Sequence, residues 1–264
     1  MSLGSPLKRV DAEAKVTGRA RYTDDHQMPG MRYAKYVRSP VAHAKVTAID
    51  TSAALAMPGV EAIFTFKDVP ELLFPTAGHA WSLEAAKRDV ADRSLLTQHV
   101  RHFGDGVAIV VARDALTAER AAALVDVTYQ ELPVITNAQA ALAEGATPIH
   151  PTGNILKKSD ISANQPTEAI SAADLQLCAH FQTPVIQHCH MESVTCFAYM
   201  EQPDHIVIVS STQIPQIVRR TVAQALGLPW SNIRVIKPYI GGGFGNKQDV
   251  LEEPMAAFLT LKMG

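Results

Sequence analysis

The sequence predicts an α+β protein with two domains. Apolar runs bounded by turn residues alternate with segments of helical periodicity, which indicates interleaved strands and helices. Hydrophobic residues make up 47% of the 264 positions, enough to bury a sizeable core. A loose stretch rich in Ala, Gly, Pro and Thr lies near the middle of the chain. Because a domain takes roughly 150 residues, this stretch is expected to separate two domains.

The first domain is predicted at residues 8–140. Loose alternation over residues 31–50, with a turn at Ser39-Pro40, predicts a strand, a turn and a second strand. A short helix at 52–57 and a strand at 60–66 follow, and residues 70–95 form an excursion without a clear period. The remaining elements are a buried strand at 106–112, a helix that Asp114 caps, and a strand at 125–131.

Residues 141–166 are predicted to be the linker, and residues 167–264 the second domain. A strand at 205–211 leads to a helix at 214–226 that has Pro215 in its first turn and Gly227 past its end. A strand at 232–240, a glycine-rich loop and a helix at 249–262 come next, and Asp249 and Glu252 have the spacing of a capping box.

The chemistry is expected where the two strands of this second domain end. A strand, helix and strand in this order form a βαβ crossover, which brings Gln213 and the glycine loop, residues 241–248, to one edge of the sheet. Consecutive glycines let the main chain approach an anion or a metal oxide and point N–H groups at it. The loop lacks the Ser or Thr of a phosphate loop after Lys247 and has Asn246 where the dinucleotide fingerprint needs glycine. A simple tight turn is the alternative for the loop, and a polar helix cap is the alternative for Gln213.

Several motifs along the chain are specific when taken together. They are Asp11-Ala12-Glu13-Ala14-Lys15-Val16-Thr17-Gly18, Ser39-Pro40 with Ala42-His43-Ala44, Tyr129-Gln130-Glu131-Leu132-Pro133, Ser211-Thr212-Gln213 and Gly241-Gly242-Gly243-Phe244-Gly245-Asn246-Lys247. With them, the chain from about Lys8 to its last residue resembles the molybdenum hydroxylases, the xanthine dehydrogenase and aldehyde oxidase family, in the subunit that carries molybdopterin. The likeness is greatest to the molybdenum subunits of bacterial xanthine dehydrogenases. It implies an α/β hammerhead domain followed by the first part of a molybdopterin-binding α+β domain.

The resemblance implies molybdenum-dependent hydroxylation of a purine or related N-heterocycle, such as xanthine or hypoxanthine, with oxygen from water. Electrons would pass to two-iron two-sulfur clusters and FAD on partner chains or domains. Gln213 would hydrogen-bond an oxo ligand of molybdenum, donating without adding charge. Phe244 and Gly245 would lie against the coordination sphere of the metal, and Gly242 and Gly243 would allow the approach to the cofactor. Gln213 and Phe244 are thus the two residues expected beside molybdenum.

Two features depart from the family or lie outside the chain. Gln248 is the expected substrate contact, but it stands where purine-oxidising members carry a glutamate, and a neutral amide cannot exchange a proton at pH 7. The resemblance places the catalytic base in a late segment beyond Gly264, so no catalytic residue is assigned here. The chain is therefore predicted to be a fragment of a longer subunit that, alone, neither holds molybdopterin tightly nor turns over.

Other readings of the same residues remain open. The chain could be a noncatalytic module that only binds other subunits, which metal analysis of the complete protein would decide. His188, His190 and Glu192 would share one face of a strand and could ligate zinc, although a polar cleft is the favoured interpretation. Cys189 is expected to be a small buried hydrophobe.

Composition excludes several partners. The net charge of -2 provides no field for nucleic acid, so the basic residues near the start and Arg219 and Arg220 are interpreted as exposed or subunit-contact positions. No apolar run reaches the roughly 20 residues of a membrane-spanning helix. Three cysteines are too few for a disulfide framework, which favours the cytoplasm. A homodimer of complexes is a further assembly that the resemblance allows.

Overall fold

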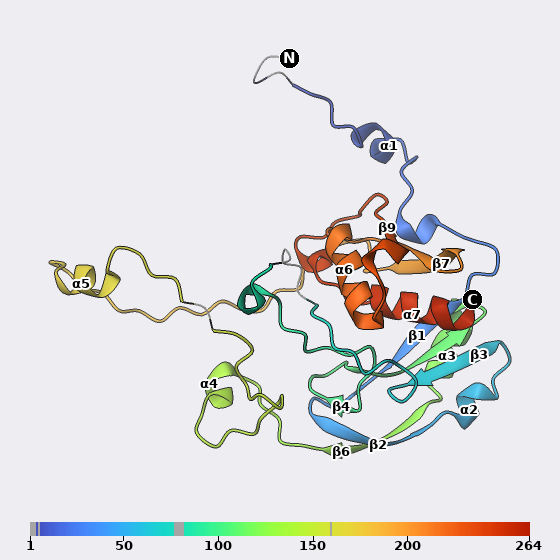
Figure 1. Cartoon of the computed structure of the whole chain (residues 1–264), viewed down its shortest axis with the longest axis horizontal. Coiled ribbons are helices and arrows are strands. Elements are labelled where there is room, and N and C mark those ends of the chain that lie inside the picture. The colour runs from blue at the N-terminus through green and yellow to red at the C-terminus, as the bar shows by residue number, and fades with distance from the viewer. Residues whose placement is uncertain (1–3, 5, 77–81, 159) are drawn as a thin grey trace. The chain divides into compact units, whose positions relative to one another are not determined.

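The computed structural model describes residues 4, 6–76, 82–158 and 160–264, which form two compact units (Figure 1). The larger unit comprises the chain up to residue 134 together with residues 190–264, and the smaller unit comprises residues 135–189. The larger unit thus combines elements of both predicted domains. The domain boundaries expected at residues 140 and 166 stay predictions.

The α+β class is confirmed by helices and strands that are interleaved along the chain. Three three-stranded sheets form, in the orders β1-β5-β3, β4-β2-β6 and β7-β8-β9. Short 3-10 turns lie at 23–25, 85–87, 230–232 and 246–248. The helices and strands are α1 (Ala12–Val16), β1 (Tyr33–Arg38), β2 (Ala44–Asp50), α2 (Ser52–Leu55), β3 (Val60–Thr65), β4 (His99–Val100), β5 (Gly106–Ala112), α3 (Ala115–Ala122), β6 (Asp126–Glu131), α4 (Ala138–Ala141), α5 (Pro166–Ser171), β7 (Cys196–Gln202), β8 (His205–Ser210), α6 (Pro215–Leu226), β9 (Ile233–Ile236) and α7 (Glu253–Met263).

Strand β5 is the centre of the first sheet, as its apolar run predicts. It pairs antiparallel with β1 on one side and β3 on the other, and every residue after Gly106 is buried. Helix α3 begins where expected, because the Asp114 side chain accepts a hydrogen bond from the Thr117 N–H at 2.8 Å. Strand β2 pairs antiparallel with β4 and β6 to make the second sheet.

The third sheet contains the predicted crossover. Strands β8 and β9 are parallel and are joined through α6, while β7 pairs antiparallel with β8. Helix α6 has Pro215 in its first turn and is followed by Gly227, whose φ of 67° is the left-handed conformation of a helix stop. The carboxyl ends of β8 and β9 therefore lie at the same edge of the sheet.

Several local predictions are wrong, each for a physical reason. Strand β9 ends at Ile236 and not at residue 240, because Pro238 has no N–H to continue the ladder. Helix α7 begins at Glu253, and Glu252 is its N-cap residue, so the capping box at Asp249 does not form. Pro254 then lies in the first turn, where its missing N–H has no helical partner to lose.

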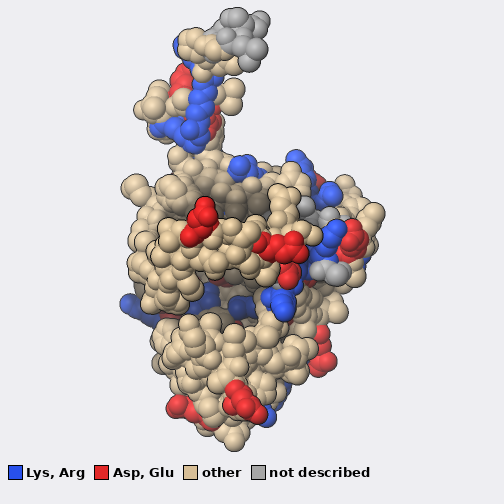
Figure 2. Space-filling model, turned by 90° about the vertical axis from the view of Figure 1, so that its left-hand side faces the viewer, with Lys and Arg blue, Asp and Glu red and all other residues tan. Residues whose placement is uncertain are grey.

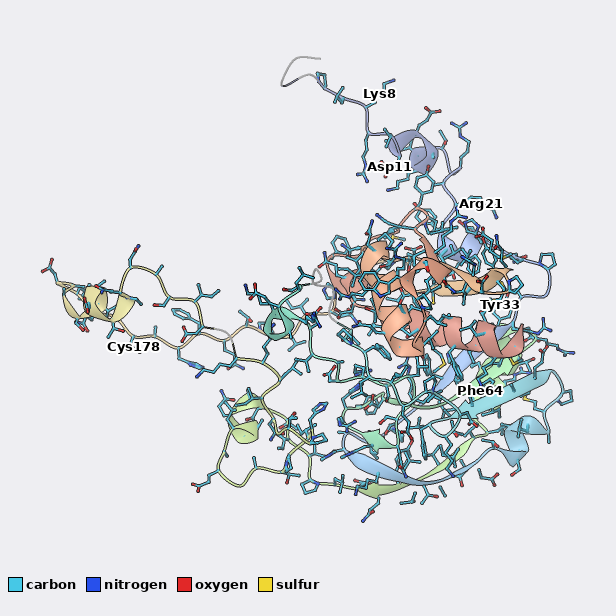
Figure 3. The ribbon with its side chains drawn as sticks, viewed as in Figure 1. Lys8, Asp11, Arg21, Tyr33, Phe64 and Cys178 are labelled. Atoms are coloured by element: carbon cyan, nitrogen blue, oxygen red, sulfur yellow. The ribbon has the colours of Figure 1, made fainter. Side chains whose placement is uncertain are left out.

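One hydrophobic core joins the first sheet to the helices of the third. Ile109 and Val111 of β5 belong to the same buried cluster as Met255 and Phe258 of α7. Phe64 of β3, labelled in Figure 3, meets the Phe258 ring edge-on, with 5.5 Å between ring centroids and an interplanar angle of 81°. This shared core fixes the glycine-loop end of the chain relative to the first sheet within the larger unit.

Two side chains have the opposite exposure from the one predicted. Arg220 is 4% exposed on α6, and its guanidinium lies 3.4 Å from the carboxylate of Asp89, a residue of the 70–95 excursion. The negative charge of Asp89 opposite this face of α6 explains why Arg220 can be buried there. Cys189 is exposed and has a φ of 49°, and its neighbours in the smaller unit form no strand. Part of the excursion, residues 77–81, lies outside the described residues.

The surface carries both signs of charge. On the face drawn in Figure 2, Lys and Arg are interspersed with Asp and Glu and do not make one continuous basic area. Near the N-terminus, exposed Arg9 and Arg19 pair with Asp11 and Glu13 at 2.5 and 2.6 Å. Within the part of the chain that the structure describes, no helix has the length and apolar character needed to cross a bilayer.

Glu253 gives a pH-dependent prediction. Its carboxylate accepts hydrogen bonds from the Ser210 hydroxyl at 2.6 Å and the Leu251 N–H at 3.2 Å, and burial raises its pKa above the ordinary 4.5. Because the raised pKa means that the folded state binds the proton more tightly than the unfolded state, protonation of Glu253 stabilises the fold. This contribution to the free energy of unfolding is complete below pH 4.5 and is lost as the pH rises through the folded-state pKa. Glu253→Gln removes the titration, so the variant should gain stability relative to the parent between pH 4 and pH 8.

Denaturant unfolding at the two pH values measures this difference. Exposed Glu131→Gln is the control, and its stability should follow that of the parent chain at both pH values. If the stability of Glu253→Gln and that of the parent chain changed equally with pH, burial would not destabilise the Glu253 carboxylate.

Candidate functional site

The site lies at the edge of the third sheet where β8 and β9 end. Gln213 follows β8, and its backbone N–H donates to the Lys247 carbonyl in the glycine loop at 2.8 Å. The backbone N–H of Gly245 donates in turn to the Gln213 side-chain Oε1 at 3.3 Å. The structure therefore brings together the amide and the loop that the sequence analysis paired, with Phe244 beside Gly245.

Each of the three consecutive glycines closely approaches a different side chain. A Cβ on Gly243 would lie 2.4 Å from Gln213 Oε1, and one on Gly241 would lie 2.6 Å from the Cβ of Glu192. Gly242 has a φ of +96°, and a Cβ there would lie 3.1 Å from that of His190. The glycines thus let the loop pack directly against Gln213 and against residues 190–192, a reason that the sequence analysis did not foresee.

The loop presents a run of hydrogen-bond donors. The backbone N–H groups of Gly242, Gly243 and Phe244 donate to no atom of the described residues, and neither does the Nε2 of Gln213. Phe244 has a φ of 50° and is 74% exposed. Its ring lies beside Gly242, where an added Cβ would be 3.3 Å from Phe244 Cε2, and Gly243 is buried. Such a succession of N–H groups, with an uncharged amide beside it, suits an anion or an oxide ligand.

Lys247 and Glu192 form a buried ion pair behind the loop, which the sequence analysis missed. The Nζ of Lys247 lies 2.6 Å from Glu192 Oε2, and the two side chains are 1% and 10% exposed. The same oxygen accepts the Gly241 N–H at 2.8 Å, while Glu192 Oε1 is buried and has no hydrogen-bond partner among the described residues. The only sequence feature that points to this ion pair is a lysine shortly after the glycines. Its partner, Glu192, is identified only by the fold.

His190 holds the loop at a second point. Its Nε2 accepts from the Asn246 side-chain Nδ2 at 2.8 Å, which leaves the proton on Nδ1 to be donated to the Glu192 carbonyl at 2.5 Å. This bonding differs from that of a metal ligand, and the strand proposed for residues 188–192 does not form. His188 belongs to the other unit. Within the described ranges, no three His, Cys, Asp or Glu residues are grouped to hold a metal ion.

Gln248 lies at the end of the same loop. It closes the 3-10 turn at 246–248, its N–H donates to the Gly245 carbonyl at 3.1 Å, and its side chain is exposed. Its amide is therefore free to meet a molecule bound near the loop.

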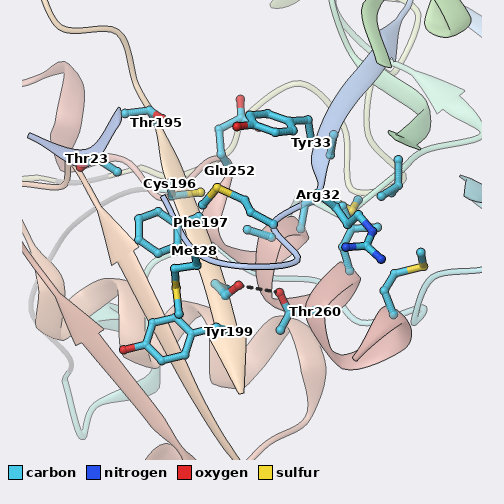
Figure 4. A pocket seen from close by; sticks show the side chains of 18 of the residues that line it. Thr23, Met28, Arg32, Tyr33, Thr195, Cys196, Phe197, Tyr199, Glu252 and Thr260 are labelled. Atoms are coloured by element: carbon cyan, nitrogen blue, oxygen red, sulfur yellow. Dashed lines mark hydrogen bonds between the residues drawn. The ribbon is translucent and has the colours of Figure 1, made fainter. Parts of the chain in front are cut away.

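A separate cavity of about 990 Å³ lies between β1, β7, α7 and residues 23–32 of the larger unit. Met28 lies beside Phe197 and Tyr199 there, and the Thr260 hydroxyl donates to a β7 carbonyl (Figure 4). Neither Gln213 nor the glycine loop lines this cavity. Burial raises the pKa of the Cys196 thiol well above its ordinary value, so the one thiol on its wall is a poor nucleophile.

Comparison with known proteins matches both halves of the chain. Residues 17–133 match the a/b hammerhead domain of aldehyde oxidase and xanthine dehydrogenase, and residues 149–264 match the molybdopterin cofactor-binding domain. The chain is 66% identical to a xanthine dehydrogenase molybdenum-binding subunit of Escherichia coli O157:H7 over 97% of its own length and 34% of that protein. It spans about a third of the length of such relatives.

Solved structures agree with this match. Quinoline 2-oxidoreductase from Pseudomonas putida 86 superposes with a TM-score of 0.86 at 31% identity, over 99% of this chain and 33% of that one. Aldehyde oxidoreductase from Desulfovibrio gigas gives a TM-score of 0.86 at 30% identity, over 99% and 29%. The hammerhead domain and the cofactor-binding domain expected from the sequence are thus confirmed as the fold.

Gly243→Ala tests whether the loop packs against Gln213 as described. Because the new methyl group would meet Gln213 Oε1, we expect the amide to be displaced and the chain to lose about 1–3 kcal/mol of stability. A crystal structure and denaturant unfolding measure the two effects. Gly104→Ala is the control, since Gly104 has a φ of +87° and open space around it, so it adds backbone strain without touching Gln213. An undisplaced Gln213 amide in Gly243→Ala would contradict the packing.

Proposed function

Because the chain belongs to the aldehyde oxidase and xanthine dehydrogenase family, we propose that it forms the first part of the molybdopterin-binding subunit of a molybdenum hydroxylase. The proposed reaction hydroxylates a purine or related N-heterocycle, xanthine- or hypoxanthine-like, with oxygen from water. The observation that carries the proposal is the pairing of the Gln213 amide with the glycine loop at one edge of the sheet. The relatives' names, which include a xanthine dehydrogenase subunit, support the substrate class.

The residues present fit the molybdenum cofactor. Gln213 Nε2 and the N–H groups of Gly242, Gly243 and Phe244 are all donors without acceptors among the described residues. They are uncharged, so they can hydrogen-bond oxygen atoms of an anionic group without forming a salt bridge that would have to be desolvated. Open space beyond Gly245, where a Cβ would meet nothing within 4 Å, leaves that side of the loop accessible.

In this proposal the chain's own residues orient the hydrogen-bond donors that would hold the cofactor. The Gly245 N–H can only donate, so it fixes Gln213 Oε1 toward the loop and leaves Nε2 able to donate to an oxo ligand of a bound cofactor. Phe244 would lie against the coordination sphere through its main chain. When bound, the cofactor supplies the two-electron oxidation that replaces a carbon–hydrogen bond of the substrate with a carbon–oxygen bond. Donors fixed in advance need no reorganisation during that step.

Gln248 is the proposed substrate contact. Its exposed amide lies on the loop that carries the cofactor donors, so it can hydrogen-bond a heterocycle there. An amide offers both a donor and an acceptor but does not take up a proton at neutral pH, so any proton transfer to the substrate would come from another group.

The rest of the machinery is proposed to lie outside residues 1–264. The catalytic base and further cofactor contacts would come from other segments of the subunit, in keeping with the third of the relatives' length that this chain covers. Iron–sulfur and FAD groups on partner chains or domains would accept the electrons, in a cytoplasmic complex that can pair into a homodimer. The alternative, a noncatalytic module that binds other subunits, needs no cofactor.

Elemental and pterin analysis of the complete native protein separates the two functions. We expect about one molybdenum and one pterin per subunit, with iron and flavin in the purified complex, and xanthine-dependent dye reduction by that complex. Residues 1–264 expressed alone should not reduce the dye. A complete protein without molybdenum and pterin would leave the interaction module as the function.

Substitution of Gln213 tests its role in the complex. Gln213→Leu removes the Nε2 donor, and loss of such a donor lowers kcat by about 100-fold. Gln248→Leu should instead raise KM more than it lowers kcat, because it removes a substrate contact. Gln216→Leu, on the exposed side of α6, is the matched control and should leave both constants unchanged. A kcat in Gln213→Leu equal to that of the control would rule out the assigned role.

A further inference from the structure

We propose that Lys247 and Glu192 are positioning residues for the cofactor donors. This inference rests on the proposed function, and it concerns how the glycine loop is held. The loop cannot hold itself, because its short turn at 246–248 supplies only the Asn246 and Gln248 N–H bonds to carbonyls within it. Its other hydrogen bonds and ion pairs with described residues go to two supports, residues 212–213 and residues 190–192.

Lys247 connects those two supports through different atoms. Its carbonyl accepts the Gln213 N–H at 2.8 Å, and its Nζ lies 2.6 Å from Glu192 Oε2. A lysine side chain that is 1% exposed needs a charged partner, so its stem and ammonium have one low-energy arrangement. The ion pair therefore fixes the main chain of Lys247, and through it the position of Gln213.

Glu192 holds the opposite end of the loop. Its Oε2 also accepts the Gly241 N–H, and its own N–H donates to the Gly241 carbonyl at 3.3 Å. A single carboxylate oxygen, Glu192 Oε2, thus links Gly241 at the start of the loop to Lys247 near its end. The donors at residues 242–244 lie between these two fixed points, so their direction depends on both.

The second carboxylate oxygen of Glu192 allows a variant that keeps the hydrogen bonds to the loop while it removes the negative charge. Glu192 Oε1 has no partner among the described residues, so Glu192→Gln can place its NH₂ there and still accept from Gly241 and Lys247 with its oxygen. Glu192→Leu removes both bonds. Glu192→Leu combined with Lys247→Met replaces the ion pair by apolar groups of similar size, a change that restores stability in buried pairs but leaves Gly241 without its acceptor.

Hydrogen–deuterium exchange resolved to single residues in the complete protein tests the proposal. Exchange of the Gly241 and Gly245 amides should be at least about tenfold faster in Glu192→Leu and in the double variant, since the loop then opens locally. Exchange should stay near the parent rate in Glu192→Gln, which keeps both hydrogen bonds, although its melting temperature should fall because the buried Lys247 ammonium loses its charged partner. In the double variant the melting temperature should return toward the parent value while the loop amides remain fast. Lys35→Met, which breaks the exposed Lys35–Glu119 pair, is the control and should change neither.

Loop exchange that simply follows the melting temperature across the variants would overturn the proposal, because the pair would then act on global stability alone. If Glu192→Leu fails to fold, Glu192→Gln and the double variant decide the question by the same comparison. The altered electron paramagnetic resonance spectrum of molybdenum(V) expected in the double variant reports the donors at the metal. A complete protein without molybdenum would defeat the proposed function, whereas the exchange result would still decide the positioning role.

Discussion

The buried Lys247 side chain is the constraint on which the site depends. Its ammonium is held by Glu192 while its carbonyl accepts the Gln213 N–H, so a single residue joins the segment before β7, the end of β8 and the loop after β9. Removal of one member of a buried ion pair destabilises a protein by about 3–5 kcal/mol, because a charge is left without a partner. A loop of glycines, which has little conformational preference of its own, acquires a defined shape from this pair.

The fold supplies the place for that interaction. Parallel pairing of β8 and β9 brings two strand ends to one edge, and α6 is the crossover connection that makes this pairing possible. Helix α7, which follows the loop, is anchored in the core that it shares with β5. Glycines give the loop a flexible backbone, but packed elements bound the loop on both sides. This arrangement suits hydrogen-bond donors that must stay in place when the charge on a ligand changes.

The sequence could predict the crossover and the meeting of Gln213 with the loop, because Pro215, Gly227 and the apolar runs mark the element ends locally. It could not predict the pairing of Lys247 with Glu192 or the burial of Arg220 beside Asp89, since both depend on residues more than 50 positions apart. The same limit applies to the glycines. Their pattern predicts that the main chain comes close to another group. Only the structure shows that Gly243 approaches Gln213, Gly242 approaches His190 and Gly241 approaches Glu192.

A crystal structure of the complete protein with its molybdenum cofactor bound measures the central claim directly. The account predicts that Gln213 Nε2 lies about 3 Å from an oxygen ligand of the metal, as a hydrogen bond requires. It also predicts that the main chain at Phe244 faces the same coordination sphere. A cofactor bound elsewhere, or a Gln213 amide turned toward protein atoms with the metal out of reach, would contradict it.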